Sequence, residues 1–476
     1  MHRREKHGLA AQRARGTPYR SAWLLLAAWI LVIFLAFLNT PHPSGSVPIA
    51  PANTAPNFNP ASPSKSSQKP KIVLRSFRNE PILSAEDVVA GKVRQFGRNR
   101  RELVRAIGHR LDKTVPDEVE KFFDAVEAGQ WEAIKSQWDL LARHSSQYEY
   151  STNHWDQLDP FWPSVLDAYG VAEQAHLWPA QQLLDYGNAI LGSLKPGMVY
   201  VGGTDNGRWI PELLNETSDG EQHMIVTQNA LADSRYLDFV NTLYSDRMAA
   251  LTIEDSQAAF QAYVTEAQKR FEHDQQFPDE PRQLRPGEDL KMVDGKLQVS
   301  GQVAVMAINE ILLQTLMQKN PELSFAIQES FPLTGTYANA LPLGPLMELN
   351  APNSFTTDQA EQSLQYWRTA AQQVLTDPEA STSEPALRAY SHDASAAAHL
   401  LAARNFTTEA EQTYGVATQL YPGNPEPVLG LADLLTQNGQ QDHARQLLQD
   451  FARQYPDQQK FLERSSAAWR LLMGNR

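Results

Sequence analysis

The 476-residue sequence has no cysteine and few basic residues outside its N-terminus. Without cysteine, disulfides, thiolate catalysis and cysteine-ligated zinc or iron–sulfur sites are excluded. The formal net charge is −13, although residues 1–20 alone carry six Arg or Lys and one Glu. The rest of the chain is therefore strongly acidic. We expect no nucleic acid partner, because phosphate binding requires concentrated lysine and arginine.

The sequence also lacks the common phosphate-binding and hydrolase motifs. The stretch MVYVGGTDNGR at 198–208 places two glycines after an apolar run, as a buried strand entering a tight turn does. It has neither the Gly-Lys-Ser/Thr ending of a phosphate loop nor the pattern GxGxxG. Ser330 has no Gly-x-Ser-x-Gly context, which disfavours a serine hydrolase. We expect no cofactor.

Charge is missing from residues 21–38, which read SAWLLLAAWILVIFLAFL. A helix of this length spans about 27 Å, enough for the apolar core of a bilayer. The basic residues 1–20 precede it, so we predict a cytoplasmic tail, a single-pass anchor in the inner membrane and an extracytoplasmic body. A cleaved signal peptide is the alternative. The apolar run is longer than is usual for one, and no clear A-x-A cleavage site is present.

Residues 39–70 contain eight prolines and no acidic residue. A segment with so little apolar surface cannot bury a core, so we predict a disordered linker. At ~3.1 Å per residue, an extended linker of this length reaches at most on the order of 90 Å. The folded body would then stand clear of the membrane.

The body is predicted to combine a helical region at 71–175 with an α/β domain at 176–380. Apolar runs at 198–201, 223–227 and 323–327 indicate buried strands, and a fourth strand is predicted at 346–349. The first two are each followed by a polar turn and a helix. This alternation favours a small, mostly parallel sheet flanked by helices. Asp294-Gly295, between two arms of alternating apolar residues, predicts a β-hairpin at 291–300.

The segment 387–476 contains a repeat with a period of 34 residues. This spacing separates Tyr-Pro at 421 from Tyr-Pro at 455, Ala398 from Ala432, and Ala410 from Ala444. Paired helices with this period and small residues at fixed positions are typical of tetratricopeptide repeats. We predict an all-α repeat tail with a capping helix at 461–472. Two repeats are fewer than usually stand alone, so we expect them to dock on the α/β domain.

Four stretches within residues 175–375 carry a resemblance to a bacterial family. They are GGTDNGRWIPELL, VTQNALADSRYLDFV, RPGEDLKMVDGKLQVSGQVAVMAINEILL and FAIQESFPLTGTYANALPLGPLMELN. Together they are similar to the soluble region that follows the multi-span membrane part of protein O-mannosyltransferase-like proteins, particularly the verrucomicrobial type, which is often joined to tetratricopeptide repeats. The resemblance implies a link to lipid-linked sugar transfer. It assigns no catalytic residue here, because the transferases carry theirs in the multi-span part.

Polar residues follow the three predicted strands, and in open α/β sheets ligands bind beyond the carboxyl ends of the strands. Asp205 and Glu329 could act as acid and base or hold a hard cation. Arg208 could bind a carboxylate or phosphate through two hydrogen bonds, and Asn229 could orient a sugar hydroxyl. The candidate ligand-binding residues are therefore Asp205, Asn206, Arg208, Asn229 and Glu329.

A structural interpretation of the same residues stays open. Asp205 and Asn206 are also typical caps of a turn or helix, Arg208 would neutralise Asp205, and Asn229 tolerates a left-handed backbone. His392 and His399 lie seven residues apart on a predicted helix, but no third ligand is evident, so we expect no metal site.

Two functions from different classes remain. The first is a membrane-anchored scaffold whose repeats bind a partner protein, in connection with surface-glycan or glycosylation machinery. A variant of it is a transferase-derived tail that docks on a separate membrane enzyme. The alternative is an α/β domain that binds a sugar or sugar phosphate and has glycosyltransferase-related activity.

Overall fold

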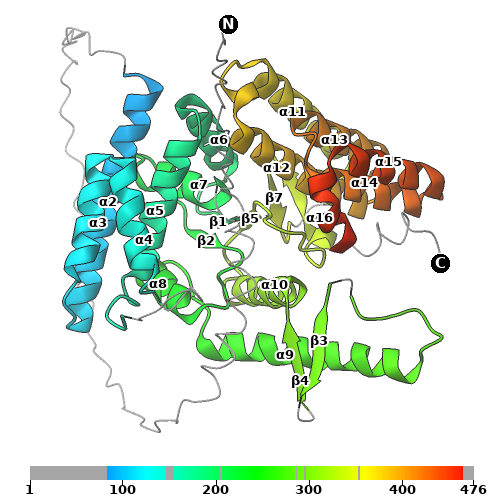
Figure 1. Cartoon of the computed structure of the whole chain (residues 1–476), viewed down its shortest axis with the longest axis horizontal. Helices are drawn as coiled ribbons and strands as arrows, with labels where there is room; N and C mark the ends of the chain where they lie inside the picture. The colour runs from blue at the N-terminus through cyan, green and yellow to red at the C-terminus, as the bar shows by residue number, and fades with distance from the viewer. Residues whose placement is uncertain are drawn as a thin grey trace, which may run out of the picture.

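The computed structural model describes residues 83–145, 155–203, 206–285, 287–293, 296–351 and 354–464. The predicted cytoplasmic tail, anchor and linker, at 1–20, 21–38 and 39–70, lie outside these ranges. Among the helices that are described, none is long and apolar enough to cross a membrane. Figure 1 shows a mainly helical molecule with a small central sheet.

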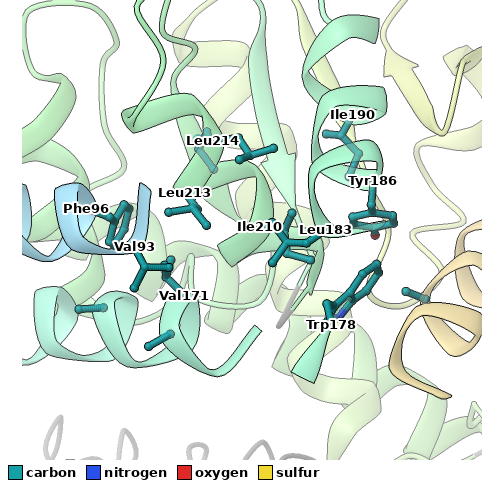
Figure 2. Packing of buried hydrophobic residues seen from close by; sticks show 14 of the residues in the cluster. Val93, Phe96, Val171, Trp178, Leu183, Tyr186, Ile190, Ile210, Leu213 and Leu214 are labelled. Atoms are coloured by element: carbon teal, nitrogen blue, oxygen red, sulfur yellow. The ribbon is translucent and has the colours of Figure 1, made fainter. Parts of the chain in front are cut away.

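The N-terminal helices pack into a bundle against one side of the sheet. They are α2 (Ala85–Leu111), α3 (Asp117–Ala128), α4 (Trp131–Ala142), α5 (Trp162–Leu177) and α6 (Ala180–Ser193). The helix α2 begins where the Ser84 side chain accepts a hydrogen bond from the Asp87 amide, a typical N-cap. Apolar side chains of α2, α5, α6 and α7 (Asn206–Glu216) meet in one core, which Figure 2 shows around Ile210 and Leu183.

The sheet has the order β2-β1-β5-β7-β6. Its strands are β1 (Val199–Gly202), β2 (Ile225–Thr227), β5 (Phe325–Ile327), β6 (Leu341–Leu343) and β7 (Leu346–Leu349). The predicted strands β1, β2, β5 and β7 are confirmed, and both β2 and β5 pair parallel to β1.

The prediction of a mostly parallel sheet is wrong, because β5-β7 and β7-β6 are antiparallel and the sheet is mixed. Only two residues join β6 to β7, and a connection this short allows antiparallel pairing alone. Gly344 takes the positive φ of +58° in this turn. Strand β6 contains Pro342, which obscured it in the sequence and which confines it to the edge of the sheet.

The opposite edge, β2, is closed by two tyrosines of α8 (Ser234–Tyr244). The Tyr244 hydroxyl accepts a hydrogen bond from the Ile225 amide at 3.2 Å, and the Tyr236 hydroxyl accepts one from the Thr227 amide at 2.7 Å. These bonds satisfy the outward N–H groups that an open edge would offer to another strand. The sheet therefore ends at α8.

A layer beside the sheet contains α9 (Ile253–Gln276), α10 (Gln302–Lys319) and the strands β3 (Asp289–Val293) and β4 (Lys296–Ser300). The antiparallel register of β3 and β4 confirms the predicted hairpin, whose turn residues 294–295 lie outside the described residues.

The C-terminal helices pack in consecutive pairs. They are α11 (Thr357–Thr376), α12 (Glu384–Ala403), α13 (Thr407–Leu420), α14 (Pro425–Gln437), α15 (Gln441–Gln454) and α16 (Gln459–Arg464), with short 3-10 turns at Tyr337–Asn339, Ala380–Thr382 and Pro456–Gln458. All four repeat alanines, Ala398, Ala410, Ala432 and Ala444, are fully buried, as the repeat pattern predicted. Helix α12 lies against the sheet (Figure 1), which confirms that the repeats dock. The predicted capping helix is described only as far as α16.

Candidate functional site

The carboxyl ends of β1, β2 and β5 lie at the same edge of the sheet, because these strands are parallel. The residues that meet there are mainly two glutamines. The Gly203 amide donates to Gln328 Oε1 at 3.1 Å. Gln228 Oε1 accepts from the Ser330 amide at 2.8 Å, and its Nε2 donates to the Phe331 carbonyl at 3.2 Å. The carboxyl ends of these strands are thus joined by two glutamines, neither of which is among the candidate binding residues.

Close approach of Gln328 explains the glycines in the turn after β1. A Cβ atom on Gly207 would lie 1.9 Å from Gln328 Oε1, and one on Gly203 would lie 2.5 Å from it. Real Cβ atoms do not come so near to another heavy atom, so a side chain at either position would displace the end of Gln328 from its hydrogen bonds. The backbone at these glycines therefore packs against Gln328 of the same chain, not against a bound ligand.

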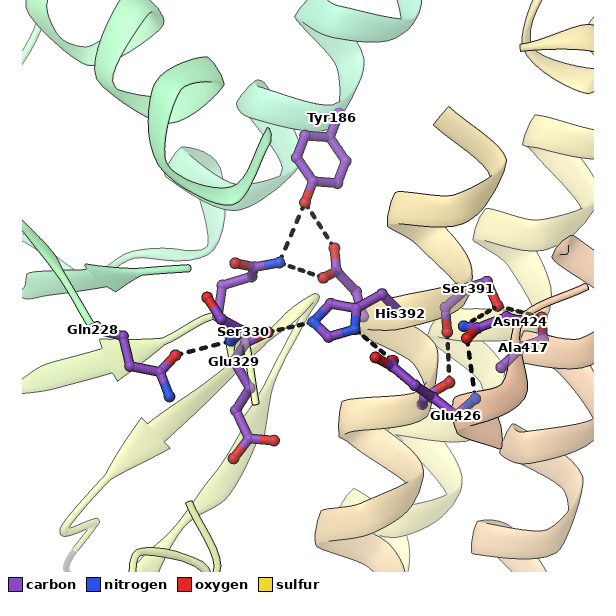
Figure 3. A network of polar contacts seen from close by, with 12 residues as sticks. Tyr186, Gln228, Glu329, Ser330, Ser391, His392, Ala417, Asn424 and Glu426 are labelled. Atoms are coloured by element: carbon purple, nitrogen blue, oxygen red, sulfur yellow. Dashed lines mark hydrogen bonds and ion pairs between the residues drawn. The ribbon is translucent and has the colours of Figure 1, made fainter. Parts of the chain in front are cut away.

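Figure 3 shows how this edge is joined to helices α6 and α12. The Tyr186 hydroxyl donates to Asp393 Oδ2 at 2.9 Å. It also accepts from Asn206 Nδ2 at 2.8 Å. Gln328 Nε2 donates to Asp393 Oδ1. Tyr186, Gln328 and Asp393 are each at most 4% exposed. Burial raises the pKa of Asp393 to about 6. We call these four residues the strand-end network.

His392 forms a second link between the sheet and the repeats (Figure 3). Its Nδ1 lies 2.6 Å from Glu426 Oε2, and its Nε2 lies 2.6 Å from the Glu329 carbonyl oxygen. Burial lowers the pKa of His392, but the Glu426 carboxylate outweighs burial and raises it to about 10. A protonated imidazole donates from both nitrogens, which matches two acceptors. Within the part of the chain that the structure describes, no group of three residues is placed to hold a metal ion.

The Glu329 carboxylate faces away from the strand-end network (Figure 3). It accepts hydrogen bonds from the Leu333 amide at 3.0 Å and from the Tyr337 hydroxyl at 2.9 Å. Only 2% of the residue is exposed, and burial raises the pKa of its carboxyl to about 7. The side chain therefore holds the loop after β5.

We expect Glu329→Gln to stabilise the protein at pH 8 by about 1–3 kcal/mol and to change little at pH 4. The unfolded carboxyl ionises near pH 4.3, whereas the folded one stays protonated until about pH 7. Stability from the protonated form is thus present below the unfolded pKa and is lost as the pH rises through 7. Urea unfolding of both proteins at each pH measures the difference.

The matched control for this prediction is Glu361→Gln, on the exposed face of α11. It should leave stability unchanged at both pH values. Equal stability of Glu329→Gln and wild type at pH 8 would contradict a buried, protonated Glu329.

Arg208 belongs to a separate, buried ion cluster. Its guanidinium pairs with Asp167 of α5, and its Nε lies 3.1 Å from Glu212 Oε1. Arg100 of α2 completes the cluster, with Asp167 at 3.4 Å and Glu216 at 3.0 Å. Arg208 is 5% exposed. Because its partners lie on α5 and α7, its side chain faces the helical bundle and not Glu329.

Of the four candidate residues that the structure describes, only Asn206 joins the strand-end network. Asp205 lies outside the described residues. Asn229 is half-buried, and no hydrogen bond from a described residue reaches its side chain. Tyr186, Gln328 and Asp393 were missed because each sits inside an ordinary helix or next to a strand. The sequence did hold one signal for the neighbouring His392–Glu426 pair, because these residues are separated by 34 residues, the period of the repeat.

One small cavity adjoins the strand-end network. The cavity beside Gln328, Asp393 and Ser363 has a volume of about 10 Å³. That is enough for about one water molecule. The polar groups at this edge therefore satisfy one another.

These features define an α/β body with a helical-repeat segment packed on the carboxyl edge of its sheet. A family model described as tetratricopeptide repeat matches residues 391–463, which include the four buried alanines. The chain is thus similar to tetratricopeptide-repeat proteins in this segment. Comparisons with curated proteins and with solved structures give no match, including over the residues that resemble the transferase-associated region.

Proposed function

We propose that the protein is a membrane-anchored extracytoplasmic scaffold whose repeats bind a partner protein. The observation that carries the proposal is the tetratricopeptide match at 391–463, together with the buried alanines that let the paired helices pack closely. Tetratricopeptide repeats present extended binding surfaces, because each repeat contacts only its neighbours.

The contacts at the sheet edge favour the repeats over the strand ends as the binding surface. Gln328 donates to Asp393, and Gln228 accepts from the Ser330 amide, so these polar groups already have partners within the protein. The adjoining cavity has a volume of about 10 Å³. A sugar or sugar phosphate needs a far larger pocket, since ligand sites usually measure ~300–1,000 Å³. For this reason we rank the scaffold above a sugar-binding or transferase-related domain.

The location in the proposal comes from the sequence. The uncharged residues 21–38 would anchor the chain in the inner membrane, and the proline-rich residues 39–70 would hold the body away from it. The resemblance of residues 175–375 suggests that the partner belongs to surface-glycan or glycosylation machinery.

Affinity capture with the full-length chain in detergent tests the proposal. We expect a partner that is retained by wild type and by Asp139→Lys on the exposed face of α4, but lost from Asp433→Lys on α14. Both substitutions reverse one exposed charge, so they differ only in the element they alter. An identical partner set for all three proteins would overturn the proposal.

A further inference from the structure

Strands β3 and β4 form a sheet of their own, apart from the five-stranded sheet. Strand β4 packs against α9 and α10, and Figure 1 shows β3 on the side of the hairpin away from α10. No described strand pairs with the other side of β3. The edges of the larger sheet differ, because two tyrosine hydroxyls close β2 and a proline interrupts β6. Strand β3 therefore offers an open edge to another strand.

The register of the hairpin determines which residues of β3 face the open side. In a hairpin with a two-residue connection, the closing pair is hydrogen-bonded. Here that pair is Val293 and Lys296. Hydrogen-bonded and non-hydrogen-bonded pairs then alternate along the two strands. Leu290 and Met292 fall in the non-hydrogen-bonded positions, so their N–H and C=O groups point to the open side.

The two faces of β3 differ in polarity. Leu290 packs against the core of the body, and Met292 lies on the same face but is exposed. Asp289 and Lys291 lie on the opposite face, where their charged groups are 3.4 Å apart and their side chains are 46% and 69% exposed. The Ser300 hydroxyl also donates to Asp289. An exposed apolar residue and exposed charges of both signs thus accompany the open backbone.

Antiparallel pairing of β3 with β3 of a second copy has one favourable register. With Leu290 opposite Leu290 of the second copy, the outward N–H and C=O groups of the two strands meet. Asp289 of each copy then faces Lys291 of the other, at non-hydrogen-bonded positions whose Cα atoms are only about 4.5 Å apart. A slip of two residues either way would place lysine opposite lysine or aspartate opposite aspartate, which is destabilising.

We propose that the protein forms a homodimer in which β3 pairs antiparallel with β3 of a second copy, centred on Leu290. The two hairpins join into one sheet with the order β4-β3-β3-β4, and a sheet of this size is more stable than an isolated hairpin. Met292 lies diagonally across from Leu290 of the second copy, so exposed apolar surface is buried. This inference goes beyond the proposed function, because it assigns a self-association surface outside the repeats.

Sedimentation equilibrium of the full-length chain in density-matched detergent tests the dimer. We expect wild type to dimerise, and Asp289→Lys and Lys291→Asp each to raise the dissociation constant by about tenfold, because each places like charges opposite one another twice. An equimolar mixture of the two variants should dimerise like wild type, since every substituted residue then faces an opposite charge. Asp442→Lys, which reverses an exposed charge on α15, should also behave like wild type.

Several results would overturn this dimer. A monomeric wild type would do so, and so would single variants that associate as tightly as wild type, because the contact would then lie elsewhere. A mixture that stays monomeric, although far-UV circular dichroism shows both variants folded, would exclude the Asp289–Lys291 register. If wild type is monomeric and Lys291→Asp loses the captured partner, the edge binds a strand of another protein instead. Partner loss in Asp433→Lys is measured separately, so failure of the dimer and failure of the scaffold function are distinguishable.

Discussion

Asp167→Asn should destabilise the protein by about 3–5 kcal/mol. Asp167 is fully buried between two arginines, Arg208 and Arg100, and Arg100 approaches its Oδ2 to 3.4 Å. The amide removes the one carboxylate that contacts both guanidinium groups, so Arg208 keeps only Glu212 and Arg100 keeps Glu216 and the more distant Glu212. Removing one partner from a buried ion cluster costs far more than the intact cluster contributes. Urea unfolding, followed by tryptophan fluorescence and by far-UV circular dichroism, measures the change.

Two further variants make the Asp167 prediction specific. Asp450→Asn removes one partner of the exposed Arg453–Asp450 pair and should leave stability unchanged, because exposed pairs contribute little. Adding Arg208→Gln to Asp167→Asn should recover part of the loss, since one of the two buried guanidinium groups that lost Asp167 is then gone. If Asp167→Asn behaves like Asp450→Asn, the cluster does not hold α2, α5 and α7 together.

Arg208 also illustrates what local sequence predicts and what it does not. Spacing places Arg208 near Asp205, three residues before it, and the structural interpretation paired the two. In the folded protein its acidic partners are Glu212, one helical turn along α7, and Asp167, 41 residues earlier. The Glu212 pair follows from helical spacing. The Asp167 pair depends on how α5 packs on α7, which no local pattern encodes.

The strands and the repeats were predictable for the same reason. Apolar runs ending in glycine or in polar residues located β1, β2 and β5, and a 34-residue period located the buried alanines such as Ala398 and Ala432. Both signals are periodic and local. Strand β7 was also located, at 346–349, but its antiparallel pairing was missed. Its partner β6 has three residues and contains Pro342, so β6 carries no alternation to recognise.

The contact between the repeats and the sheet was expected in outline only. Two repeats are too few to stand alone, so they were expected to dock on the rest of the chain. Their number does not indicate which side chains form the contact. Asp393 sits in the alanine-rich α12, where an acidic residue normally faces solvent. In the folded protein it is 2% exposed and accepts from Tyr186 and Gln328. Its burial follows from the docking of α12 on the carboxyl edge of the sheet.

Asp393→Leu should therefore loosen the repeats from the α/β body and lower stability by about 2–4 kcal/mol. The Tyr186 hydroxyl and Gln328 Nε2 both donate to this carboxylate, and each would become a buried donor without an acceptor. Asp393→Asn keeps one acceptor oxygen in the same shape, so its cost should be clearly smaller. Thermal unfolding ranks the two variants against wild type.

Hydrogen exchange shows where the Asp393→Leu effect occurs. Amides of α12 and of the turn after β1 should exchange faster, because the network joins these two elements. Amides of α3, which lies in the N-terminal bundle, should keep their wild-type protection. A uniform increase across the chain, or equal stability of the Leu and Asn variants, would mean that Asp393 does not act through Tyr186 and Gln328.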